Sequence, residues 1–113
     1  MDVVVLYAAV APPAVTTGGA TMRRYTTPQD AVDALAIGAA VVLVSDGIAE
    51  RDVATVAGAV AASRATVIEV RAAGWDGQTP SPLSAACRGV ISGFGERGVV
   101  RAVELLRREQ AKA

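Results

Sequence analysis

The chain has 113 residues, of which 52% are hydrophobic, and its 11 basic and 11 acidic residues give a formal net charge of zero. This balance excludes the basic surface that binds nucleic acid or an anionic membrane, and the single cysteine excludes an intramolecular disulfide. Without histidine an ordinary zinc site lacks its ligands, so we expect neither a metal nor a cofactor.

The first ten residues, MDVVVLYAAV, indicate a β-strand rather than a targeting segment. They contain no basic stretch and are too short to cross a bilayer. We therefore expect a cytoplasmic protein without a membrane partner.

Five short strands are expected, most of them apolar runs of the kind found in buried parallel sheets. They lie at Val3 to Ala8, Ala20 to Tyr25, Ala40 to Ser45, Ala65 to Val70 and Gly89 to Ser92.

Three helices are expected between and after these strands. The first begins at Pro28, after the capping residue Thr27, and ends at Gly38. The second covers Asp52 to Ser63 and the third Val99 to Arg108, each with an apolar stripe. The alternation predicts an α/β protein with an open, parallel, five-stranded, flavodoxin-like sheet.

No helix is expected between the first two strands. Residues 9–20, AVAPPAVTTGGA, include two consecutive prolines and have poor helix chemistry. Parallel sheets are normally covered on both faces, so a missing helix would leave apolar sheet bare. A second copy of the chain is the expected cover.

The last third of the chain carries a recognisable pattern. Within Ser81 to Leu106, the stretch from Gly89 to Gly98 reads G-V-I-x-G-x-G-x-x-G and leads into the last helix. Upstream, SDGIAERDV at Ser45 to Val53 and ATVIEVRAA at Ala65 to Ala73 keep the spacing of two further motifs. Over residues 28–108 the chain resembles type II dehydroquinases (3-dehydroquinate dehydratases). The resemblance implies one dehydroquinase-like domain over residues 1–113 and self-association into trimers or dodecamers.

The reactive positions of that family are replaced. Its two histidines align with Arg51 and Arg71, its loop asparagine with Ser45, and its Ser-Asn pair with Ala73 and Gly74. The arginine and tyrosine of its lid have no counterpart. Arginine cannot be deprotonated usefully in a protein, so Arg51 and Arg71 cannot transfer protons as histidines do. We expect no dehydration of 3-dehydroquinate at a meaningful rate.

The cleft residues still allow binding. Ser45, Arg51, Arg71, Ala72 and Ala73 are the candidate ligand-binding residues, and a small anion is the expected ligand because a guanidinium group holds carboxylate or phosphate through paired hydrogen bonds. In the alternative interpretation, both arginines only pair with neighbouring acids at positions 46, 50, 52 or 69.

Two acids and two other motifs complete the candidates. Asp46 and Glu50 follow the third strand, where ligands bind in open α/β sheets, and either could be a base if desolvated. The alternative is that they line the first turn of the next helix.

Cys87 has no histidine partner and is expected to be a small hydrophobe. Gly93 to Gly98 also has the form G-x-G-x-x-G, but in the last strand-helix unit we interpret it as a tight turn rather than a dinucleotide site.

Three functional hypotheses remain. The favoured one is a catalytically degenerate, homo-oligomeric, dehydroquinase-like binding or structural module. The second is a lyase or isomerase acting on a small carboxylated ring, with Asp46 or Glu50 as base. The third is 3-dehydroquinate dehydratase activity itself.

Overall fold

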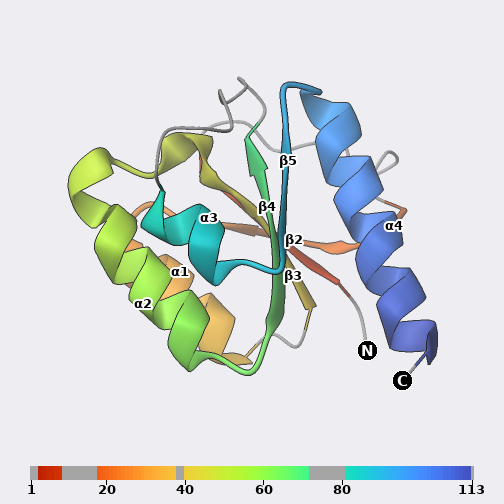
Figure 1. Cartoon of the computed structure of the whole chain (residues 1–113), viewed down its shortest axis with the longest axis horizontal. Helices are drawn as coiled ribbons and strands as arrows, with labels where there is room; N and C mark the ends of the chain where they lie inside the picture. Colours follow the sequence, from red (N-terminus) through yellow and green to blue (C-terminus); the bar gives the residue numbers. More distant parts are fainter. Residues whose placement is uncertain (1–2, 9–17, 38–39, 72–80, 113) are drawn as a thin grey trace.

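The sheet has five parallel strands in the order β2-β1-β3-β4-β5. Figure 1 shows helices on both sides of this sheet. The computed structural model describes residues 3–8, 18–37, 40–71 and 81–112. The strands are β1 (Val4–Tyr7), β2 (Thr21–Arg24), β3 (Ala40–Val44), β4 (Thr66–Arg71) and β5 (Gly89–Ser92). The predicted five-stranded, flavodoxin-like sheet is confirmed, and each strand lies where its residues indicated.

The apolar composition of the central strands follows from burial on both faces. In β3, Val41, Val42 and Leu43 are fully buried, although consecutive side chains point to opposite faces of a sheet. Val41 is in register with Val4 of β1 and Val67 of β4. A strand enclosed in this way has no polar face, so its residues form a continuous apolar run rather than an alternating one.

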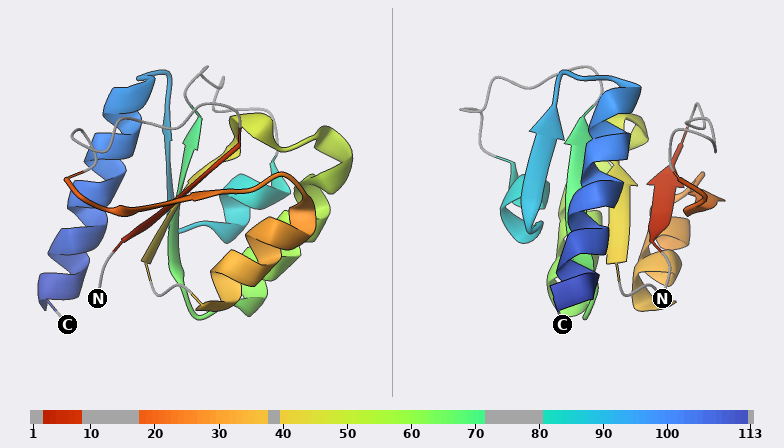
Figure 2. Two further views of the ribbon diagram at one scale, coloured as in Figure 1. Left: turned by 180° about the vertical axis from the view of Figure 1, so that it is seen from behind. Right: turned by 90° about the vertical axis from the view of Figure 1, so that its right-hand side faces the viewer.

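Helices cover the two faces unequally. Helices α1 (Pro28–Ile37), α2 (Val53–Ala62) and α3 (Pro82–Ala86) lie on one face, and α4 (Glu96–Lys112) lies on the other, as the two views of Figure 2 show. One core cluster joins Leu6 and Leu43 to residues of α1, α2 and α3, and a second joins Val5 and Val42 to residues of α4. None of the helices in the described part of the chain is long and apolar enough to cross a bilayer.

The helix boundaries follow from local chemistry. The amide of Asp30 donates to Thr27 Oγ1 at 3.2 Å, which confirms the predicted cap of α1, whereas the expected end at Gly38 lies outside the described residues. Helix α3 was not predicted. Its cap is Ser81, whose side chain accepts from the amide of Ser84, and Pro82 follows at the first helical position.

The glycines between β5 and α4 form a tight turn. Gly93 and Gly95 have φ angles of 81° and 54°, a region that side chains disfavour. A Cβ on Gly98 would lie 3.1 Å from Val70 Cγ1 and 3.2 Å from Ile91 Cγ2. These positions support the interpretation of the G-x-G-x-x-G motif as a turn with close helix packing.

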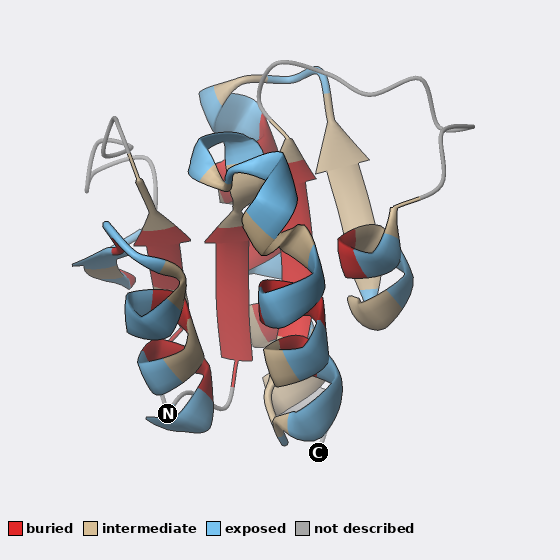
Figure 3. Cartoon of the chain, turned by 90° about the vertical axis from the view of Figure 1, so that its left-hand side faces the viewer, coloured by how far each residue is buried: buried red, intermediate tan, exposed pale blue. Residues whose placement is uncertain are grey.

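The expectation of a bare sheet face beside β1 is wrong. Val3 and Val5, which belong to the cluster facing α4, are both 0% exposed within a single chain. The prediction that no helix follows β1 concerns mainly residues 9–17, which lie outside the described residues. Exposed apolar surface occurs instead at the opposite edge, where every residue of β5 is only partly buried, as Figure 3 shows.

Candidate functional site

A cavity of about 280 Å³ lies at the carboxyl ends of β3 and β4. Ligands bind at this edge of open α/β sheets because the loops that follow the strands meet there. Two short 3-10 turns, Ser45–Gly47 and Glu50–Asp52, form part of the wall. The lining residues are Ser45, Asp46, Ile48, Glu50, Val53, Glu69, Arg71 and Leu83.

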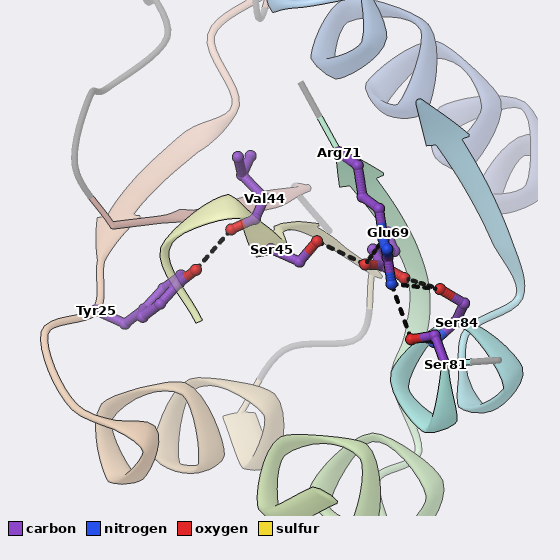
Figure 4. A network of polar contacts seen from close by, with 7 residues as sticks. All are labelled: Tyr25, Val44, Ser45, Glu69, Arg71, Ser81 and Ser84. Atoms are coloured by element: carbon purple, nitrogen blue, oxygen red, sulfur yellow. Dashed lines mark hydrogen bonds and ion pairs between the residues drawn. The ribbon is translucent and has the colours of Figure 1, made fainter. Parts of the chain in front are cut away.

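The centre of the site is the carboxylate of Glu69, which is completely buried. Three side chains donate to it. Ser45 Oγ lies 2.5 Å from Oε2, Arg71 Nε lies 2.7 Å from the same oxygen, and Ser84 Oγ lies 2.6 Å from Oε1. Figure 4 shows these donors converging on Glu69 from β4 itself, from the end of β3 and from α3. A buried carboxylate needs such compensation because it has lost its hydration.

Arg71 is anchored at both ends of its guanidinium group. Besides the bond from Nε to Glu69, Nη2 donates to Ser81 Oγ at 2.8 Å and to Ser84 Oγ at 3.0 Å. Its side chain is 23% exposed. Arg71 thus pairs with Glu69, one of the acids named in the pairing alternative. Within the described residues, no buried side-chain nitrogen or oxygen lacks a hydrogen-bond partner.

Arg51 lies apart from Arg71. Its side chain is 87% exposed, and its Nε lies 4.0 Å from Asp52 Oδ2, which agrees with the pairing alternative. It lines a neighbouring cavity of about 170 Å³ together with Tyr25 and residues of α1, and it does not line the cavity around Glu69. The structure therefore does not bring the two arginines together as a joint anion site. Ala72 and Ala73 lie outside the described residues.

The two candidate bases do line the cavity. Asp46 and Glu50 stand on the two 3-10 turns, and both are exposed. The cavity thus has three carboxylates, those of Asp46, Glu50 and Glu69, against the single guanidinium group of Arg71. The formal charge of the lining is negative, which opposes an anionic ligand.

Tyr25 lines the neighbouring cavity and reaches the end of β3. Its hydroxyl donates to the carbonyl oxygen of Val44 at 2.6 Å, and the residue is 4% exposed. Burial raises the pKa of the Tyr25 phenol, and the negative charge of Asp46 raises it further. A phenol held in this way packs against the core and donates a hydrogen bond, and its raised pKa keeps it protonated at neutral pH.

Cys87 is also unsuited to nucleophilic chemistry. Burial and, to a smaller extent, the charge of Glu69 raise the pKa of its thiol to about 12, while Arg71 acts in the opposite direction. The thiolate is the reactive form, so such a thiol is inert at neutral pH. This agrees with the expectation of a small hydrophobe.

Sequence reasoning missed Ser81 and Ser84. One available signal for them was the Ser-Pro pair at positions 81 and 82, which is typical of a helix start. This pair does not indicate which strand the helix would face. A glutamate within the apolar run TVIEVR was the second available signal, because a charge on a buried strand requires partners.

Among the residues that the structure describes, no three or more His, Cys, Asp or Glu side chains are grouped so that they could hold a metal ion, the carboxylates of this cavity included. No protein-family model matches the sequence, and no curated protein matches it. The fold does have a solved counterpart, the type II dehydroquinase from Propionibacterium acnes, with a TM-score of 0.69, 20% identity, and coverage of 94% of this chain and 95% of that one. At this identity the comparison shows that the chain has the fold of a type II dehydroquinase.

Proposed function

We propose that this protein has the dehydroquinase fold without the dehydratase activity and acts as a homo-oligomeric binding module for a small polar molecule. One observation carries the proposal. At residue 71, where the resemblance places a histidine, the guanidinium group is bound to buried Glu69 and to two serines. A side chain that keeps its proton and is held in place can support a cavity wall, but it cannot act as a general acid.

The ligand that fits the cavity best carries hydrogen-bond donors or a positive charge. Asp46 and Glu50 present acceptors to the cavity, and the one lining cation is already paired with Glu69. We propose this ligand class in place of the small anion expected from the sequence, because Arg51, which was expected to bind the anion together with Arg71, lines another cavity.

Two measurements test the proposal. Purified protein given 3-dehydroquinate should show no formation of 3-dehydroshikimate by absorbance above about a thousandth of an ordinary enzyme rate. Titrations with glucosamine, glucose and glucuronate, which share one ring and differ in charge, should shift amide signals around Asp46 and Glu50 in that order of strength. Preference for glucuronate would contradict the assigned ligand class, and dehydration above that threshold would contradict the loss of activity.

The lyase or isomerase alternative has one observation in its favour, since both candidate bases line the cavity. Against it, both carboxylates are exposed, whereas a base that removes a proton from carbon works best where water is excluded. Turnover of a carboxylated ring that disappears in Asp46→Asn or Glu50→Gln would establish it.

Self-association and a cytoplasmic location remain part of the proposal. The resemblance implies trimers or dodecamers, although the burial of Val3 and Val5 removes the argument from a bare sheet. Light scattering at micromolar concentration tests assembly, and a folded species with the mass of one chain, 11.4 kDa, would contradict it.

A further inference from the structure

A second hollow lies away from the cavity around Glu69, along the free edge of the sheet. We call it the β5–α4 groove. Its volume is about 590 Å³, and it is lined by Val90, Ile91, Ser92, Phe94, Arg97, Gly98, Arg101 and Leu105. Figure 2 shows α4 lying over the sheet with β5 at its margin.

The groove includes the edge of the strand itself. Val90 and Ile91 are consecutive, and consecutive side chains project to opposite faces of a sheet, yet both line the groove. In the described part of the chain, β5 pairs with β4 alone. Its outer side therefore presents backbone groups that another extended segment could bond.

The two edges of the sheet differ in their protection. At β2 the exposed side chains include Arg23 and Arg24, and charges of this kind discourage further pairing. At β5 the residues are Gly-Val-Ile-Ser, without charge or proline. An uncharged edge beside an apolar groove is a surface that accepts a strand.

The groove also has a charge preference. Arg97 and Arg101 stand four residues apart on α4, and both line the groove. Arg101 Nη1 lies 3.4 Å from Glu104 Oε2, whereas the side chain of Arg97 makes neither a hydrogen bond nor an ion pair within the described ranges. Phe94, at 66% exposed, adds an apolar anchor at the end of the strand.

We propose that the β5–α4 groove binds an extended acidic segment of a partner protein, which adds to the sheet along β5. Its backbone bonds the strand edge, its apolar side chains cover Ile91, Phe94 and Leu105, and its carboxylates face Arg97 and Arg101. A second copy of this chain fits less well, because two-fold pairing of β5 with itself would bring these arginines towards their own counterparts.

A pair of labelled five-residue peptides tests this inference, one alternating Glu with Val and the other alternating Lys with Val. By fluorescence anisotropy the acidic peptide should bind at least ten-fold more tightly, and its affinity should fall as salt is added. Amide signals of Gly89 to Ser92 should shift on binding.

Phe94→Ser and Arg97→Glu should each weaken binding of the acidic peptide at least ten-fold. Ile37→Ser is the matched control, since Ile37 is 73% exposed but lies at the end of α1, and it should change nothing. Equal binding of both peptides, or no binding at millimolar concentration, would overturn the proposal. Self-association that Phe94→Ser abolishes would instead identify a second copy as the occupant, and would also overturn it.

Discussion

Replacing Arg71 by methionine should destabilise the protein through Glu69 rather than through lost packing. Methionine keeps a long apolar stem beside α3, but it removes the 2.7 Å bond from Nε and the positive charge beside a carboxylate that is 0% exposed. Breaking a buried ion pair leaves the remaining charge without compensation, which is more costly than losing the pair as a whole.

The size of the effect follows from the donors that remain. Removing one partner of a buried pair costs about 3–5 kcal/mol, and because Ser45 and Ser84 still donate to Glu69 we expect the lower end, about 3 kcal/mol. For a domain of 113 residues this corresponds to a fall in Tm of about 12 °C.

Urea unfolding of wild type, Arg71→Met and the double variant Glu69→Gln/Arg71→Met measures the effect. The double variant removes the uncompensated charge, so it should recover at least half of the lost free energy. A loss below about 1 kcal/mol for Arg71→Met would refute the view that Arg71 compensates Glu69.

Three further predictions concern single residues. Gly47→Ala should destabilise the protein because the new Cβ would overlap Cβ of Ala8. Gly58 lies inside α2 and a Cβ there would meet nothing within 4 Å, so Gly58→Ala should raise the free energy of unfolding in urea by about 0.5–1 kcal/mol. Hydrogen bonds at the start of α1, the first from the Thr26 amide, lower the pKa of Asp30, so its contribution to stability is complete above the unfolded pKa of about 3.8 and is lost as pH falls through the lower folded pKa. Asp30→Asn should therefore reduce the fall in stability with decreasing pH, and an unchanged fall would contradict this. With a pKa of about 12, Cys87 should react with a thiol reagent at pH 8 about a thousand-fold more slowly than free cysteine, and an ordinary rate would show that the thiol is not buried.

The fold could be predicted because its signals are local. Val41 to Leu43 form an apolar run since the strand is enclosed on both faces, and Gly93 and Gly95 mark a turn that needs positive φ. Helix α3 was not predicted, because a helix of five residues is too short for a periodic pattern of apolar residues to be recognised.

The candidate site was less predictable because it depends on directions in space. Ser84 is 15 residues from Glu69 in sequence, and only the packing of α3 beside β4 brings its hydroxyl to the carboxylate. The resemblance aligned both Arg51 and Arg71 with histidines of the family, so the sequence offered no reason to distinguish them. It could not indicate that one guanidinium group turns inward to Glu69 while the other lies 87% exposed beside Asp52.

Residue 71, where the resemblance places a histidine, is an arginine, and this residue type determines what the end of β4 can do. Beside a buried carboxylate, a histidine is charged only part of the time near neutral pH, and this makes it both a proton donor and an incomplete counter-ion. Arginine stays charged and offers donors in a fixed plane, so it compensates Glu69 at every physiological pH and also holds Ser81 and Ser84. The same geometry that gives Glu69 a permanent partner leaves residue 71 without an exchangeable proton, so one physical cause accounts for the stability of this network and for the loss of dehydration that we propose.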